Sequence, residues 1–145
     1  MVAIYRMSVP SARHPADVFE YLARFSKAAF WDPGVSSAEE ITPGPPACGS
    51  AYRMMVEFLG LSVPLEYRIE EIDIPKRVAL RAENAFITST DVIEVAPADG
   101  GGSIVIYEAT LVPKGVSTLL EPLLGAAFRR IGDRASAGLR AALAA

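Results

Sequence analysis

Residues that build disulfides and metal cages are nearly missing from this chain of 145 residues. It has one cysteine, Cys48, and one histidine, His14. A lone cysteine cannot form an internal disulfide, and one cysteine with one histidine cannot complete a His/Cys zinc site. We therefore expect no structural disulfide, no metal and no cofactor, and a reducing cytoplasm as the location.

Clustered positive charge and long apolar runs are missing as well. The 14 basic and 17 acidic residues give a net charge of −3, and the longest basic run is Arg129-Arg130. Nucleic-acid binding depends on concentrated positive charge, so we exclude it. No apolar run approaches the ~18–20 residues of a membrane helix, and no secretory signal pattern is visible. We expect no transmembrane segment.

Apolar residues are abundant instead. Hydrophobic types make up 51% of the sequence, which is too apolar for an intrinsically disordered chain. The length fits one domain, and we predict a single domain over residues 1–145. The apolar surplus either packs a large core or lines a cavity.

Turn and capping signals divide the chain into a clear order of elements. A first strand is predicted over 2–9, ending before a proline. A helix begins at Pro15, because proline suits a first helical position and an acidic residue follows in the first turn. A second short helix is predicted over 26–30. Strands broken by turns then fill 35–111, and a long helix occupies 117–143.

Two neighbouring strands can be aligned through their alternating apolar residues. A two-residue turn at Gly60-Leu61 would pair Phe58 with Val63, so that the two apolar faces coincide. The next strand would then place Leu80 opposite Ile69. The aligned apolar residues are Tyr52, Met54, Val56, Phe58, Val63, Leu65, Tyr67 and Ile69.

The final hairpin places a carboxyl group among apolar residues. Its apolar positions are odd-numbered on both strands, so any register that joins the apolar faces also puts Ser89 and Asp91 there. Asp91 then lies either directly opposite Tyr107 or one diagonal step away. A carboxylate on such a face is costly unless it is hydrogen-bonded or neutral.

The last helix carries an apolar stripe with two glycines beside it. Each helical glycine costs about 1 kcal/mol relative to alanine, so Gly125 and Gly132 suggest close approach of another backbone or of a ligand. The stripe consists of Leu124, Phe128, Ile131, Ala135, Leu139 and Ala142.

Five segments together resemble a known family. They cover residues 15–22, 31–35, 48–52, 72–77 and 105–107, the last leading to 114–115. In this order the chain resembles the START-like (SRPBCC) superfamily, specifically its polyketide cyclase/dehydrase and lipid-transport branch. The resemblance implies an α+β, Bet v 1-like helix-grip fold. Such a fold has a seven-stranded curved antiparallel sheet wrapped around a long C-terminal helix, with two short helices between strands 1 and 2.

The resemblance also implies a hydrophobic cavity between sheet and helix. Its rim would comprise the gate-like turn Leu59-Gly60-Leu61, the loop ending at Phe86, and the start of the last helix near Gly115. Trp31 matches a position where aromatase/cyclases of the family carry a cavity tryptophan. Apolar residues are unusual at a turn tip. They could fold down onto the helix, gate a ligand or contact a partner.

Two functions of different class fit these residues. We favour binding or transport of a hydrophobic small molecule, such as a lipid, isoprenoid or polyketide. The alternative is a polyketide cyclase or dehydratase in which Asp91 and a cavity tyrosine, Tyr107, transfer protons. The basic candidate nearest to the cavity, Arg68, falls on the polar face of its strand, which weakens the enzyme hypothesis.

The expected ligand contacts follow from the inward strand positions and the helix stripe. A role in protein interaction through the apolar loops, a homodimer included, also stays open. The residues expected to contact the ligand are Trp31, Tyr52, Met54, Tyr67, Leu80, Asp91, Tyr107, Leu120, Leu124 and Phe128.

Overall fold

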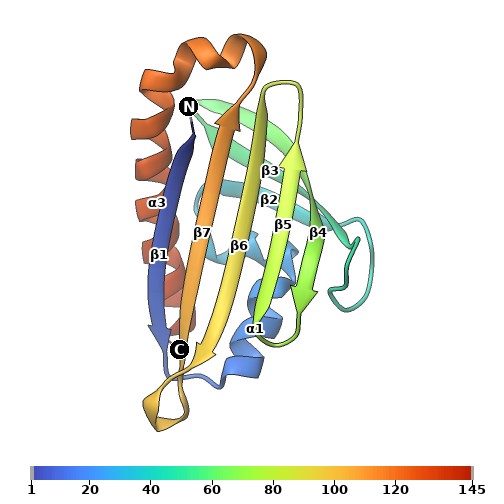
Figure 1. Cartoon of the computed structure of the whole chain (residues 1–145), viewed down its shortest axis with the longest axis vertical. Coiled ribbons are helices and arrows are strands. Elements are labelled where there is room, and N and C mark those ends of the chain that lie inside the picture. Colours follow the sequence, from blue (N-terminus) through green and yellow to red (C-terminus); the bar gives the residue numbers. More distant parts are fainter. Residues whose placement is uncertain (1, 145) are drawn as a thin grey trace.

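The structure, a computed structural model, describes residues 2–144, and for residues 116, 117 and 120 it describes the backbone alone. Strands and helices follow one another in the predicted order (Figure 1). The elements are β1 (Ala3–Ser11), α1 (Pro15–Ala23), η1 (Phe25–Lys27), α2 (Ala28–Trp31), β2 (Val35–Glu40), β3 (Ala51–Phe58), β4 (Leu61–Asp73), β5 (Arg77–Glu83), β6 (Ile87–Pro97), η2 (Asp99–Gly101), β7 (Ser103–Pro113), η3 (Gly115–Leu120) and α3 (Glu121–Leu143).

The strands form one antiparallel seven-stranded sheet in the order β1-β7-β6-β5-β4-β3-β2. The long helix α3 runs beside the edge strand β1, and the short helices between β1 and β2 lie near the opposite end of the molecule from η3 (Figure 1). Among the described helices, none combines the length and apolar character needed to cross a bilayer. The α+β helix-grip architecture predicted from the sequence is confirmed.

The N-terminal elements begin and end for recognisable local reasons. Pro15 starts α1 as predicted, and the Nδ1 atom of His14 accepts a hydrogen bond from the Ala16 amide at 3.3 Å. The first strand runs two residues further than predicted, to Ser11. Pro10 is tolerated inside β1 because β1 is an edge strand, where one side of the backbone has no ladder partner.

The predicted register of the β3–β4 hairpin is wrong by two residues. Phe58 pairs with Leu61 rather than Val63, so the turn is Leu59-Gly60. Both turn residues have positive φ, +52° and +78°, as a two-residue type I′ turn requires. A slip of two residues preserves the side-chain alternation, and the apolar faces still coincide. The predicted pairing of Leu80 with Ile69 is confirmed.

The β6–β7 hairpin adopts the diagonal one of the two predicted registers. Ile93 pairs with Tyr107, and Asp91 pairs with Ala109. Asp91 and Tyr107 therefore lie two residues apart on the same face of the sheet. Asp91 is 7% exposed and Ser89 is also buried, so both polar residues occupy the apolar face, as expected from the sequence.

Two glycines allow α3 to approach the rest of the molecule. A methyl group at Gly132 would overlap the ring of Tyr5, so the close neighbour there is a side chain rather than the predicted backbone or ligand. At Gly125 no protein atom lies within 4 Å of such a methyl group, so of the two predicted neighbours, a backbone or a ligand, the backbone is wrong there. The tightest approach was not predicted: a methyl group at Gly138 would overlap the carbonyl oxygen of Trp31.

The inner face of the sheet is covered unevenly. At one end, α1 packs on β6 and β7 while η1 packs on β2 and β3. We call this end the packed half; its core residues are Tyr52, Ile69, Val78, Leu80, Ile93, Val95 and Val105. The remaining inner face, towards the β3–β4 turn and the β5–β6 loop, is the open half.

Candidate functional site

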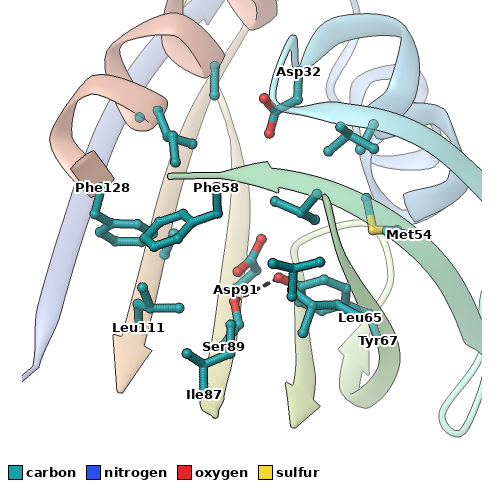
Figure 2. A pocket seen from close by; sticks show the side chains of 18 of the residues that line it. Asp32, Met54, Phe58, Leu65, Tyr67, Ile87, Ser89, Asp91, Leu111 and Phe128 are labelled. Atoms are coloured by element: carbon teal, nitrogen blue, oxygen red, sulfur yellow. Dashed lines mark hydrogen bonds between the residues drawn. The ribbon is translucent and has the colours of Figure 1, made fainter. Parts of the chain in front are cut away.

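The open half of the sheet encloses a cavity together with α3. Its volume is about 810 Å³, and its walls come from β1, β3, β4, β6, β7, α3 and the segment around α2 (Figure 2). The lining is almost entirely aliphatic and aromatic. Residues of the walls include Met7, Val35, Met54, Val56, Phe58, Val63, Leu65, Ile87, Ala109, Leu111, Leu124, Phe128 and Ile131.

The mouth of the cavity is apolar and exposed. Leu59, Leu61 and Phe86 line the cavity while remaining 45%, 67% and 57% exposed. The Asn84 side chain stabilises the β5–β6 loop that carries Phe86. Its Oδ1 atom accepts hydrogen bonds from the amides of Phe86 and Ile87 at 2.8 and 2.9 Å. Leu59 and Leu61 thus stand at the entrance, on either side of Gly60, and are not buried against the helix.

The floor of the cavity carries a buried acid bonded to a tyrosine. The Tyr107 hydroxyl donates a hydrogen bond to Asp91 Oδ2. Burial raises the pKa of Asp91 to about 7, although the bond from Tyr107 opposes that rise and the charge of Asp32 adds to it. Burial also raises the pKa of Tyr107 well above 10, so this hydroxyl stays protonated and acts as a donor. Beside them, the Tyr67 and Ser89 hydroxyls are 2.7 Å apart.

Asp32 is a charged site residue that sequence reasoning missed. It follows α2, lines the cavity, and accepts a hydrogen bond from the Gly34 amide to its Oδ1 atom at 2.8 Å. Burial raises the pKa of Asp32 to about 6, against the lowering effect of that amide. An aspartate before Pro-Gly has the pattern of a turn residue. The available signal was its position directly after Trp31, which was already assigned to the cavity.

Aromatic contacts hold the floor in place. The rings of Trp31 and Tyr107 meet edge to face, with centroids 5.7 Å apart, and those of Phe25 and Tyr67 do so at 5.0 Å. Such pairs contribute about 0.5–1.5 kcal/mol beyond their buried area. The tyrosine that bonds to Asp91 is therefore restrained by packing as well as by its hydrogen bond.

Most predicted ligand contacts share this one cavity, but two do not line it. Trp31, Met54, Tyr67, Asp91, Tyr107, Leu124 and Phe128 line the walls or floor. Tyr52 and Leu80 are fully buried in the packed half instead, because α1 and η1 cover that end of the sheet. The Leu120 side chain lies outside the described residues.

Charges around the site are of one sign. Among the described residues that line the cavity there is no Lys, Arg or His. Arg68 lies on the outer face as predicted, where its Nη2 atom is 3.0 Å from Glu66 Oε2 and both side chains are exposed. In the described part of the chain, no group of three or more His, Cys, Asp or Glu residues could hold a metal ion.

Comparison with solved structures agrees with the observed fold. The aromatase/cyclase Zhui from Streptomyces sp. R1128 superimposes with a TM-score of 0.80 at 14% identity, covering 99% of this chain and 94% of that one. A START superfamily protein from Mycobacterium smegmatis gives 0.77 at 12% identity, over 97% and 96% of the two chains. A major latex-like protein 151 from Panax ginseng gives 0.67 at 13% identity, over 98% and 97%. At such low identity these likenesses establish the fold alone.

A sheet that grips a long helix around an internal cavity defines the class: a START-like, helix-grip protein. A family model described as polyketide cyclase / dehydrase and lipid transport matches residues 3–144. The chain belongs to that family. No match is found among curated proteins.

Proposed function

We propose that this protein binds or carries a hydrophobic small molecule in the cavity between the sheet and α3. The observation that carries the proposal is a space of about 810 Å³ with an almost wholly apolar lining. Ligand pockets of roughly 300–1,000 Å³ with apolar walls and a few polar groups are typical of small-molecule sites. The description of the family includes lipid transport, which supports the same function.

The mouth supports entry of an apolar molecule. Large exposed apolar side chains are tolerated singly on protein surfaces, but here three of them gather at one opening. Leu59, Leu61 and Phe86 give an apolar ligand a continuous surface between solvent and cavity. We propose these residues, with Gly60 at the tip of the turn, as the gate.

A cavity-filling variant tests the binding function. Ala109 lines the cavity from β7, so Ala109→Phe should reduce the affinity for Nile red, an uncharged apolar dye, by about tenfold or more. Ala96 is exposed on β6, and Ala96→Phe is the matched control that should leave the affinity unchanged. Extraction of the purified protein followed by mass spectrometry should identify an apolar molecule in the wild type. A protein that excludes Nile red and carries no extractable molecule contradicts the proposal.

A second candidate function rests on the Asp91–Tyr107 pair. A carboxyl group with a pKa of about 7 can accept a proton at neutral pH. Once protonated, Asp91 can donate to the Tyr107 oxygen, and the hydroxyl proton of Tyr107 is then available to a carbonyl oxygen. Those are the groups required for intramolecular aldol condensation of a diketone with loss of water. No described lining residue supplies a positive charge for the developing enolate, which is why we place this function second.

The enzymatic candidate is tested with 2,6-heptanedione, whose cyclisation and dehydration give an enone that is followed by its absorbance. Asp91→Asn and Tyr107→Phe should each abolish turnover and leave the unfolding midpoint at pH 5, where Asp91 is protonated, close to that of the wild type. Turnover that persists in both variants contradicts a catalytic role. If both variants unfold, the pair is structural.

A further inference from the structure

The cavity carries negatively charged side chains in addition to its apolar walls. Two carboxyl groups, Asp32 and Asp91, line it, and the described lining residues contain no cationic side chain. Lys114, at the start of η3 near the rim loop, is held by Glu83, with 2.9 Å between Nζ and Oε2. A ligand inside the cavity therefore meets negative charge that no lining residue balances.

Each of the two carboxyl groups is oriented through one oxygen and leaves the other available. Asp32 Oδ1 accepts the Gly34 amide, and Asp91 Oδ2 accepts the Tyr107 hydroxyl. Within the described residues no hydrogen bond reaches Asp32 Oδ2 or Asp91 Oδ1. Neither oxygen is among the fully buried atoms without a partner, so both keep some accessible surface. Because both residues line the cavity, these two oxygens face it. Figure 2 shows the two carboxyl groups directed into the same space from opposite sides.

We propose that the cavity selects an apolar molecule that carries one protonated amine, and that it excludes anionic ligands such as fatty acids. This inference rests on the proposed ligand-binding function and specifies the chemistry of its ligand. The amine would lie between Asp32 and Asp91, with the apolar body against the aliphatic walls towards the mouth.

The physical reason is the strength of charge interactions in an apolar cavity. A cation near two carboxylates gains far more there than in water, whereas an anion adds a third negative charge. The raised pKa values of Asp32 and Asp91 show the cost of holding negative charge there without a cation.

Three ligands that share one tail separate head-group charge from hydrophobicity. Decylamine, decanol and decanoate are titrated against the complex of the protein with Nile red at pH 8, where both aspartates are ionised and the amine is charged. The amine should bind about tenfold more tightly than the alcohol, and the carboxylate about tenfold more weakly.

Single substitutions assign the preference to the two carboxyl groups. Asp32→Asn and Asp91→Asn should each reduce the affinity for decylamine by about tenfold and leave that for decanol within about twofold. Asp73 is exposed at the end of β4, so Asp73→Asn loses the same charge outside the cavity and should change neither affinity. Unfolding midpoints are recorded for every variant. If Asp91→Asn fails to fold, Asp32→Asn carries the test.

The pH dependence provides an independent measurement. The groups that face Asp91 are Tyr67 from β4, Ser89 from its own strand, Tyr107 from β7, and Asp32 beyond α2. Both tyrosines stay protonated in this range, so among these groups only Asp32 and Asp91 titrate between pH 8 and pH 5. The affinity for decylamine should fall over that interval, whereas the affinity for decanol stays constant.

The outcomes distinguish this inference from the function on which it rests. If decanol binds and decylamine binds no better, the inference is wrong while the proposed binding function stands. If decanoate binds as tightly as decylamine, or the preference for the amine survives both Asn substitutions, the inference is also wrong. If none of the three displaces Nile red, the inference is wrong, whereas the binding function fails only if the protein also excludes Nile red and carries no extractable molecule.

Discussion

The two halves of the sheet's inner face carry the same apolar alternation, but one half is packed as core and the other lines a cavity. Along β6, Ile93 is fully buried in the packed half, and Ile87 lines the cavity in the open half. Along β7 the boundary falls between Val105 and Tyr107. Both halves face inward, and the difference lies in whether α1 and η1 cover them. Strand periodicity therefore identifies which face is inside, whereas the covering helices decide whether that inside is filled.

The boundary between the halves is also where the polar groups gather. Asp91 and Tyr107 are the first inward residues on the open side of the line, and Tyr67 occupies the equivalent place on β4. Polar groups at such a boundary can face the cavity while their backbone is fixed by the packed half. The cavity therefore has a polar floor beneath apolar walls.

Alanine substitutions at two isoleucines of β6 should change the free energy of unfolding by very different amounts. Ile93→Ala should lower the free energy of unfolding by about 3 kcal/mol, because it leaves a hole in a filled core. Ile87→Ala should lower it by about 1 kcal/mol, because its side chain already borders empty space and is half-buried. Urea unfolding measures both. Equal losses would mean that the cavity is closed and packed in solution.

A second comparison concerns two glycines of α3. Gly138→Ala should lower the free energy of unfolding by about 2 kcal/mol, since the new methyl group overlaps the Trp31 carbonyl oxygen and forces the helix away. Gly125→Ala should raise it by up to about 1 kcal/mol, because the methyl group meets nothing and alanine favours the helix. Thermal and urea unfolding give the signs. A stabilised Gly138→Ala variant would contradict the observed approach of α3 to Trp31.

The buried acid should make stability depend on pH. The pKa of Asp91 is raised in the folded state from 3.8 to about 7, so the folded protein binds more protons than the unfolded chain between these values. The contribution of this group is therefore greatest below pH 4 and is lost as the pH rises to about 7. Between pH 5 and pH 8 the loss should be roughly 2 kcal/mol.

Asp91→Asn isolates that contribution. The variant should show a smaller fall in unfolding free energy between pH 5 and pH 8 than the wild type, and Asp73→Asn should behave like the wild type. A wild type and an Asp91→Asn variant with parallel pH profiles would show that the carboxyl group is not desolvated.

The smallest effect concerns the turn at the mouth. Leu59 has a φ of +52°, a conformation that costs a leucine roughly 1 kcal/mol or more, and an Asn-Gly pair is preferred in such a turn. Leu59→Asn should therefore raise the free energy of unfolding by about 0.5–1 kcal/mol while weakening the binding of Nile red. A variant that is both more stable and an equally good binder would contradict a role of Leu59 in the gate.

Much of the fold followed from the sequence because alternation and turn signals are local. The inward position of Asp91 was predictable, since every register that joined the apolar faces of β6 and β7 placed it there. The β3–β4 register was not, because Leu-Gly is a poor match to the turn preferences and the predicted Gly60-Leu61 turn fits the alternation equally well. No sequence pattern predicts a positive φ at a leucine.

The site was predicted less completely, because it depends on contacts between distant segments. Tyr52 and Leu80 have the same pattern as Met54 and Tyr67, and only the placement of α1 and η1 puts them in the packed half. Asp32 was missed because an aspartate before Pro-Gly is typical of a turn residue. The approach of Gly138 to Trp31 joins residues more than a hundred positions apart in the sequence, so no local signal could indicate it.

The most direct test of the account compares the methyl signals of the two halves in the presence of a ligand. Isoleucine and valine methyl groups are labelled with carbon-13, and decanol is titrated into the protein. Ile87, Val56 and Val63 line the cavity and should shift with saturation, whereas Ile93 and Val105 in the packed half should stay nearly unchanged. Shifts absent from all five signals, or equal in the two halves, would contradict a ligand cavity in the open half.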